Sequence, residues 1–181
     1  RTPPLLGHEG ERFRLQRFPL GSRVIYPPDP LPRIRDVRGA IRHALANPHD
    51  MEPLESLLTP GMKLTIGVDD VSLPLPPMQA PDIRQLVLEE VIELAARKGV
   101  DDLKIIMANS LHRRMTSSEI KHAVGERVHR SFYPHDLGNH DAEDRDNLTY
   151  VGKTDKGEDV EINKRVAESD LVVYVNINLV A

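Results

Sequence analysis

The residues with the clearest chemical potential are His112 and Arg113, which follow an apolar run at residues 103–107. A second apolar run, residues 63–68, is followed within two positions by the carboxylate of Asp70. An imidazole titrates near neutral pH, so it can take a proton in one step and return it in another. If both runs are parallel strands, their carboxyl ends share the edge of a sheet where α/β proteins bind ligands. We therefore expect Asp70 and His112 to face each other across one opening.

The same residues also have purely structural interpretations. Adjacent aspartates such as Asp69 and Asp70 commonly form turns and helix caps. His112 could be a packed histidine bonded to a backbone carbonyl, and Arg114 could be solvated. Perturbed side chains gather in catalytic clefts, but structural ion-pair networks resemble them. The spacing in the sequence leaves these alternatives open.

Two histidine–aspartate pairs, His135–Asp136 and His140–Asp141, raise the question of a metal site, because imidazole and carboxylate groups both bind transition metals. Their spacing fits no metal motif on a helix or strand, so hydrogen bonding within a loop is the simpler interpretation. A metal-dependent hydrolase built on His112, His135, His140 and Asp141 is a third hypothesis. The sequence contains no glycine-rich phosphate loop.

The elements that must position these residues alternate between strands and helices. Residues 12–20 alternate polar and apolar side chains, which predicts a half-buried strand. Further strands are expected at residues 62–68, 103–108, 147–153, 159–163 and 171–177, and helices at residues 34–48, 51–58, 80–100, 116–124 and 163–170. This order predicts parallel pairing with right-handed crossovers. The helix at residues 116–124 should begin with a capping box, because Thr116 stands three positions before Glu119. We expect an α/β fold: a mostly parallel, open, Rossmann-like sheet with helices on both faces, plus short N-terminal strands.

Three finer expectations follow from residue periodicity. The helix at residues 80–100 should bury an apolar stripe of Ile83, Leu86, Val87, Val91 and Leu94. The apolar runs at residues 103–107 and 171–175 should be covered on both faces of the sheet. Residues 127–146, rich in His, Asp and Arg, should be mostly loop.

Composition excludes several classes of protein. The net charge of −4 and the pI of about 6.1 argue against binding to nucleic-acid backbones or acidic membranes. The chain lacks a run of apolar residues long enough to span a bilayer. It also has no cysteine, which removes disulfides, thiolate nucleophiles and zinc–thiolate sites. We expect a cytoplasmic protein with no nucleic-acid or membrane partner.

The organisation predicted for the 181 residues has two parts. Residues 1–20 form an N-terminal arm and first strand, and residues 21–181 form the α/β domain. The chain begins at Arg1 and ends directly after a strand-like run, so we expect it to be a piece of a longer protein.

Several segments together resemble one known family. "DVSLPLP" at residues 70–76 is similar to a D-x-[ST]-R-P-x-P motif, and "SLHRRMT" at residues 110–116 is similar to G-x-H-R-x-[MST]-T. The segment from residue 139 to residue 177 resembles the family's H-D loop and the G-x-P-V-x-I-N stretch that follows it. The chain therefore resembles the N-terminal domain of the lactate racemase family, whose members depend on a nickel-pincer nucleotide.

This resemblance implies a specific chemistry. In the family, the nickel-bound ring accepts a hydride from a 2-hydroxy acid and returns it to the other face, while two histidines alternate as general base for the hydroxyl proton. His112 matches one of these histidines. Asp70, Ser72 and Arg113 match positions expected to bind substrate or cofactor. The implied partners are a small 2-hydroxy acid and a C-terminal domain of the same protein.

Two departures from the family pattern qualify these expectations. Leu73 stands where the family's lactate enzymes have an arginine that pairs with the substrate carboxylate. A substrate other than lactate is therefore expected. The chain also ends before the second histidine, the cofactor lysine and the nickel-binding histidine, so this fragment should hold neither cofactor nor metal and be inactive. The alternative is a non-catalytic nucleotide- or carboxylate-binding module of the same fold.

Overall fold

The computed structural model describes residues 1–25, 29, 31–71 and 80–177. It divides into two compact units, Arg1–Ile34 and Arg35–Ala181. This division rests on contacts within the chain, and the expected start of the family domain at residue 21 remains a prediction.

The first unit is a two-stranded antiparallel hairpin of β1 (Leu5–Glu9) and β2 (Arg12–Gln16). The strand expected at residues 12–20 is thus present over Arg12–Gln16, but all five residues are exposed, so the expectation that it is half-buried is wrong. Leu6 pairs with Leu15 and His8 pairs with Phe13 in the register of the hairpin. The apolar residues of these pairs lie largely exposed.

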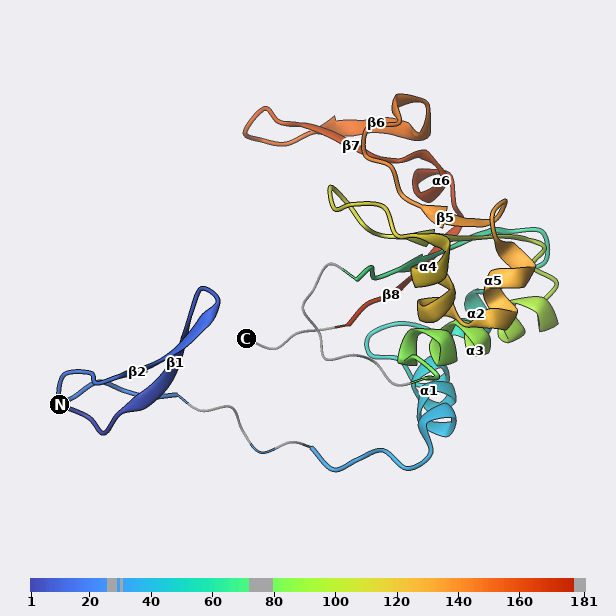
Figure 1. Ribbon diagram of the computed structural model, residues 1–181. Coiled ribbons are helices and arrows are strands. Elements are labelled where there is room, and N and C mark those ends of the chain that lie inside the picture. Colours follow the sequence, from blue (N-terminus) through green and yellow to red (C-terminus); the bar gives the residue numbers. More distant parts are fainter. Residues whose placement is uncertain (26–28, 30, 72–79, 178–181) are drawn as a thin grey trace. The chain divides into compact units, whose positions relative to one another are not determined.

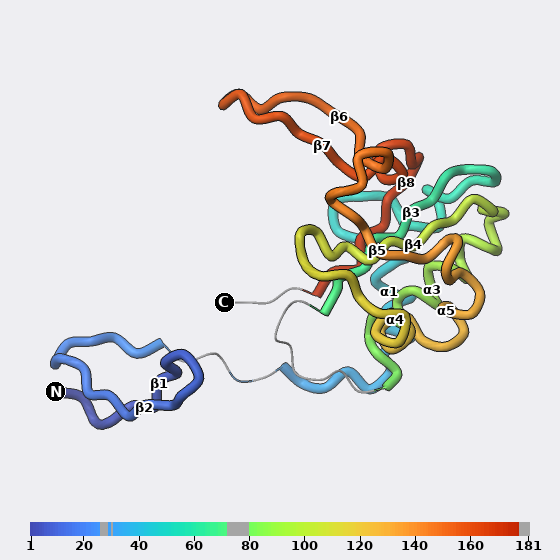
Figure 2. The backbone as a smooth tube through the Cα atoms, turned by 45° about the horizontal axis from the view of Figure 1, so that its top comes forward, coloured from blue at the N-terminus to red at the C-terminus, as the bar shows by residue number. Residues whose placement is uncertain are grey.

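The second unit contains a four-stranded parallel sheet in the order β5-β4-β3-β8. Its strands are β3 (Lys63–Val68), β4 (Asp102–Met107), β5 (Leu137–Asn139) and β8 (Leu171–Val175). The helices are α1 (Val37–Ala46), α2 (Leu54–Leu57), α3 (Ile83–Arg97), α4 (Ser117–Val124), α5 (Glu126–Phe132) and α6 (Lys164–Ala167). Helices α1, α3, α4 and α5 gather on one side of the sheet, and α6 lies on the other (Figure 1, Figure 2). The predicted α/β class with a parallel sheet flanked by helices is confirmed.

A separate antiparallel pair, β6 (Leu148–Lys153) and β7 (Asp159–Asn163), follows a short 3-10 turn, Arg145–Asn147. This pair extends from the same side of the sheet as α6 (Figure 1). Both strands were expected at these positions. None of the helices in the described part of the chain is both long and apolar enough to cross a membrane.

The core lies between the sheet and the helices of its first face. In the parallel register, each inward residue of β3 meets an inward residue of its neighbours, because parallel strands in register keep side chains on the same face. The rows are Leu103–Leu64–Leu171, Ile105–Ile66–Val173 and Met107–Val68–Val175. The three β3 members of these rows are fully buried.

The second face of the sheet is less covered than predicted at the β8 edge. Val172 and Tyr174 of β8 are 42% and 54% exposed, so the expectation that residues 171–175 are buried on both sides is wrong. In the middle of the sheet, Arg165 of α6 covers this face and hydrogen-bonds to Thr65 Oγ1 at 3.1 Å. β8 is one of the two edge strands of the described sheet.

The buried stripe of α3 also differs from the prediction. Val91 and Leu94 are buried as predicted and Val87 packs against the core, but Ile83 is 37% exposed. At the start of the helix the charged Arg84, at 5% exposure, is buried in its place. The second half of the predicted stripe is therefore confirmed, and its first position is wrong.

The segment at residues 127–146 is more ordered than the expected loop. It contains most of α5 and the whole of β5, which pairs with β4 through Leu137 and Asn139. Gly125, at a φ of 82°, separates α4 from α5 and allows the second helix to begin at once. The strand has only three residues, too few for alternation to reveal.

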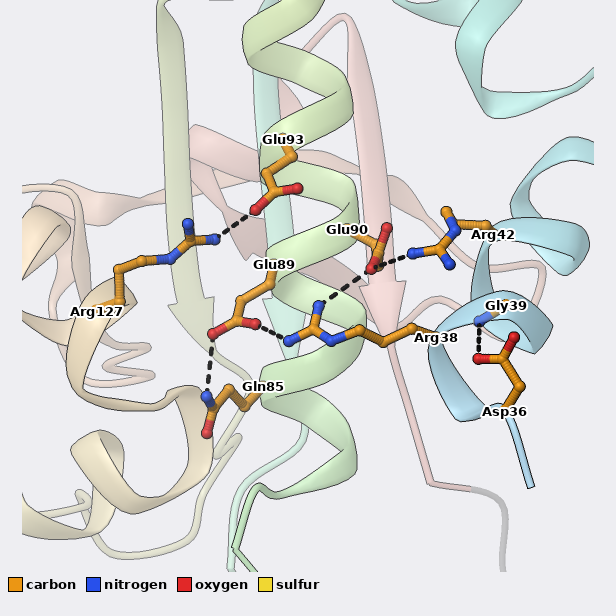
Figure 3. Close-up of polar contacts among 9 residues, drawn as sticks. All are labelled: Asp36, Arg38, Gly39, Arg42, Gln85, Glu89, Glu90, Glu93 and Arg127. Atoms are coloured by element: carbon orange, nitrogen blue, oxygen red, sulfur yellow. Dashed lines mark hydrogen bonds and ion pairs between the residues drawn. The ribbon is translucent and has the colours of Figure 1, made fainter. Parts of the chain in front are cut away.

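Helix α1 is joined to α3 by ion pairs. No α1 side chain is fully buried. Arg38 hydrogen-bonds to Glu89 and, at 3.0 Å, to Glu90, and Arg42 bonds to Glu90 at 3.1 Å (Figure 3). From the other side, Gln85 donates to Glu89 at 3.0 Å. Burial would by itself raise the pKa of Glu89, but the hydrogen bonds from Arg38 and Gln85 outweigh it and leave the pKa below its ordinary value.

A carboxylate whose pKa is lowered by folding adds stability above its ordinary pKa and loses that contribution as the pH falls. We therefore expect Glu89→Gln to lower the free energy of unfolding by about 1 kcal/mol at neutral pH, because Arg38 is partly exposed and solvent screens the pair. Below the ordinary carboxyl value of 4.5 the difference from the unaltered chain should shrink. Urea unfolding across this pH range measures it, with Glu168→Gln as a control. A difference that does not change with pH would contradict the assignment.

Candidate acid–base site at the sheet edge

The topology of the sheet places the candidate residues at a location that suits a ligand. In chain order, the sheet strands read third, second, first and fourth, which matches four adjacent strands of the six-stranded doubly wound order. The order reverses at β3, and ligands of such folds bind outside the carboxyl ends of the strands near that reversal. Asp69 and Asp70 follow β3, the His112 loop follows β4, and Asn176 and Ile177 follow β8.

Asp70 and His112 lie in direct contact at this edge, as the spacing predicted. His112 Nδ1 and Asp70 Oδ2 are 3.0 Å apart. The Asp70 side chain is 8% exposed, whereas that of His112 is 52% exposed. The pair thus joins a buried carboxylate to an imidazole whose other edge is open to solvent, which is the arrangement that orients a histidine for proton transfer.

The two consecutive aspartates at the end of β3 contact the ends of its two neighbouring strands. While Asp70 contacts the loop after β4, Asp69 contacts the end of β8: Tyr174 Oη donates to Asp69 Oδ1 at 2.6 Å, and the Ile177 amide donates to Oδ2 at 2.8 Å. Gly67 leaves space for the Tyr174 ring in this position, because a Cβ at residue 67 would lie 2.8 Å from that ring. The pair of aspartates is therefore a link between three strand ends and more than a turn.

The Tyr174–Asp69 bond has a spectroscopic consequence. The hydrogen bond to Asp69, followed by burial and the negative charges nearby, raises the pKa of Tyr174 to about 12. A raised pKa means that this contribution to stability is complete below the ordinary value of 10.0 and is lost as the pH rises toward about 12. We expect Asp69→Asn to move the ionisation of Tyr174 toward its ordinary value, measured by tyrosinate absorbance.

The chain has four tyrosines, so the transition must be assigned. Tyr174→Phe should remove the most alkaline step from the absorbance titration and leave the other steps in place. Gly67→Ala should act like Asp69→Asn, because the added methyl group displaces the ring. If the most alkaline step survives in Tyr174→Phe, the hydrogen bond is not the cause of the shift.

The loop that carries His112 is held at both ends. Ser110 adopts a positive φ of 47°, and the His112 amide donates to Asn109 O at 2.7 Å. At the other end, Thr116 and Glu119 form the predicted capping box at the start of α4. These anchors present the imidazole outward between β4 and α4.

Arg113 extends from this loop to Glu119. Its guanidinium group donates to the two Glu119 carboxylate oxygens at 2.9 and 2.7 Å. These bonds, with those from Thr116, lower the pKa of Glu119 to about 2. In the described part of the chain, no hydrogen bond joins the Arg113 and His112 side chains. Its assignment to substrate or cofactor binding therefore remains a prediction.

A cavity of about 270 Å³ lies beside His112. It is lined by Asn109, His112 and Arg114 on one side and by His140 and Asp141 on the other. Arg114 is exposed and pairs with Asp141, and both residues line the cavity. Asn109 is 1% exposed, and its Oδ1 atom finds no hydrogen-bond partner in the described structure. The cavity is polar and of a size suited to a small molecule.

Three residues of the metal hypothesis, His112, His140 and Asp141, line the same cavity, but the described residues form no metal site. His140 Nδ1 lies 3.2 Å from the Asn163 amide, Asp141 pairs with Arg114, and His135 lines a different cavity on the second face of the sheet. Within residues 1–25, 29, 31–71 and 80–177, no group of three or more His, Cys, Asp or Glu side chains could hold a metal ion. Ser72 and Leu73 lie outside the described residues.

One buried residue of this edge was missed by the sequence analysis. Arg84, in the first turn of α3, is 5% exposed and pairs with Asp82, which is 1% exposed. Its Nη1 atom donates to the backbone carbonyls of Asp69 at 2.9 Å and Asp70 at 3.1 Å. The signal available in the sequence was the D-x-R spacing at the start of an otherwise apolar helix.

The fold and this edge define a doubly wound α/β domain with a histidine–aspartate pair where such domains bind ligands. The family model of the lactate racemase N-terminal domain matches residues 10–179. The chain belongs to this family.

Known relatives agree with that assignment. The lactate racemase of Thermoanaerobacterium thermosaccharolyticum is 27% identical over 136 residues, which cover 74% of this chain and 29% of the relative. The structure of its apoprotein matches with a TM-score of 0.63 at 26% identity, covering 76% of this chain and 31% of that one. A crystal structure of a Thermotoga maritima protein shares the fold, with a TM-score of 0.53 at 15% identity. The chain thus spans less than a third of the lengths of these relatives.

Proposed function

We propose that this chain is the N-terminal part of a nickel-pincer nucleotide-dependent racemase or epimerase, which interconverts the stereoisomers of a 2-hydroxy acid by reversible hydride transfer. His112 serves as one general acid and base. The single observation that carries the proposal is the 3.0 Å contact between His112 and the buried Asp70 at the sheet edge of a lactate racemase family member. Such a protein would act in the cytoplasm, in keeping with a sequence that has no cysteine.

In this proposal, each side chain has a defined task. Asp70 accepts a hydrogen bond from Nδ1–H of His112, which leaves the lone pair of Nε2 on the open side of the ring. Nε2 then takes the proton of the substrate hydroxyl and later returns it. A histidine is suited to both steps because its ordinary pKa lies near neutral pH. Ser72 and Arg113 complete the binding of substrate or cofactor.

The bound nickel-pincer nucleotide would supply the acceptor for the hydride. The described residues fit the proton-transfer part of this chemistry and not the metal-holding part, because they contain no cluster of potential metal ligands. The cavity of about 270 Å³ beside His112 is comparable in size to a small substrate. The nickel and most of the nucleotide would be held by other parts of a full-length protein, including its C-terminal domain.

The test uses the full-length protein that contains this chain, loaded with nickel and cofactor. Single enantiomers of lactate and of larger 2-hydroxy acids are incubated in D₂O, since Leu73 makes lactate itself a poor candidate. We expect loss of optical purity with retention of the hydrogen on the carbon that bears the hydroxyl. Deuterium at that carbon would contradict hydride transfer. Binding by calorimetry without any stereochemical change would favour the alternative, a non-catalytic nucleotide- or carboxylate-binding module.

A further inference from the structure

The guanidinium group of Arg84 is placed where it can control the Asp70–His112 pair. Arg84 Nε donates to Asp82 Oδ1 at 3.0 Å, and Nη2 donates to Oδ2 at 2.8 Å. These two parallel bonds form the paired geometry that fixes the plane of an arginine. The remaining nitrogen, Nη1, points to the turn after β3, where it reaches the carbonyls of Asp69 and Asp70.

The start of helix α3 does not by itself require this arrangement. The Asp82 side chain already caps the helix by accepting from the Arg84 amide at 2.9 Å. Removing a guanidinium group and a carboxylate from water is costly, and a capping aspartate alone would avoid the cost of the guanidinium. The contacts that only the guanidinium can make are those from Nη1 to the two carbonyls.

The two carbonyls define the conformation of one residue. The carbonyl of Asp69 belongs to the peptide plane before the Asp70 Cα atom, and the carbonyl of Asp70 belongs to the plane after it. Holding both planes fixes the φ and ψ angles of Asp70, since these are the soft dihedrals between the planes. The direction of the Cα–Cβ bond follows from them, and with it the place of the carboxylate that bonds His112.

We propose that Arg84 is a positioning residue for His112, acting through the backbone of Asp70. Its importance for catalysis rests on the proposed function, whereas its effect on the His112 ring does not. Arg84 touches neither His112 nor the cavity beside it. Lysine should replace it only in part, because an ammonium group cannot bind Asp82 through two parallel bonds and reach both carbonyls at once.

The test is NMR spectroscopy of the ring nitrogens of His112 in the ¹⁵N-histidine-labelled chain, with His112→Gln to assign the signals. Asp70→Asn gives the reference for a lost hydrogen bond. We expect Arg84→Gln to shift the Nδ1 signal most of the way to its position in Asp70→Asn, and Arg84→Lys to give an intermediate shift. Arg38→Gln, which removes another arginine bonded to α3, should leave the signal unchanged.

A folded Arg84→Gln variant with the Nδ1 signal of the unaltered chain would overturn the proposal. If both Arg84 variants fail to fold, exchange with solvent in the unaltered chain decides: the Nη1 protons should exchange slowly, and fast exchange would overturn the proposal. In the full-length enzyme, Arg84→Lys should lower kcat with little change in KM. An unshifted His112 Nδ1 signal in Arg84→Gln refutes positioning by Arg84. Full activity of His112→Ala refutes the proposed function, so the two failures are distinguishable.

Discussion

Replacing His112 by alanine in the full-length protein is expected to slow the interconversion of stereoisomers by about 10²- to 10⁴-fold, the usual contribution of a positioned general acid–base. The physical reason is that the substrate hydroxyl loses the group that takes its proton. Because the imidazole is half exposed, its removal should cost less stability than the removal of a fully buried side chain. The rate of loss of optical rotation measures the effect, with thermal unfolding as the check on folding.

A matched control comes from a second histidine of the same domain. His43 lies exposed on α1 and bonds only to Asn47 among the described residues. His43→Ala should keep the rate of the unaltered protein. An equal loss of rate in both variants would mean that the His112 result reflects general damage, and an unaffected His112→Ala would remove His112 from the mechanism.

Replacing Asp82 by alanine is expected to lower the free energy of unfolding by about 3–5 kcal/mol, because it leaves the Arg84 guanidinium buried without its partner. Folded proteins are stable by only about 5–15 kcal/mol, so this is a large fraction of the total. Urea unfolding of the 181-residue chain measures it. The cost includes the lost cap of α3, which accounts for about 1 kcal/mol of it.

The comparison for Asp82 is an ion pair with a similar distance, held by one hydrogen bond at the surface. Arg145 and Glu161 are 2.7 Å apart, but their side chains are 76% and 42% exposed. Glu161→Ala should therefore cost less than about 1 kcal/mol. If the two variants were destabilised equally, burial would not be what makes the Asp82–Arg84 pair important.

Local patterns predicted the elements whose signals are contained within a few residues. The apolar run at residues 62–68 became β3, and Thr116 with Glu119 marked the start of α4. The contact between Asp70 and His112 was also predicted, because parallel strands bring their carboxyl ends to one edge whatever their separation in sequence. Each of these predictions needed only periodicity, capping chemistry or topology.

The features that were missed depend on partners distant in the chain. Arg84 lies on the buried face of α3, where it donates to the carbonyls of Asp69 and Asp70. Apolar periodicity instead favours Ile83 for that position. The exposure of Tyr174 follows from the place of β8 at the edge of the described sheet, which its apolar sequence does not reveal. The three residues of β5 were too few for a pattern.

The central claim is that Asp70 and His112 work as one unit at the edge of the sheet. A double-mutant cycle on kcat/KM in the full-length protein tests it most directly, using Asp70→Asn, His112→Gln and the combined variant. If the carboxylate acts only through the imidazole, the combined variant should be about as slow as His112→Gln alone. Two losses that simply multiply in the combined variant would show that the residues act independently, and would contradict this account of the site.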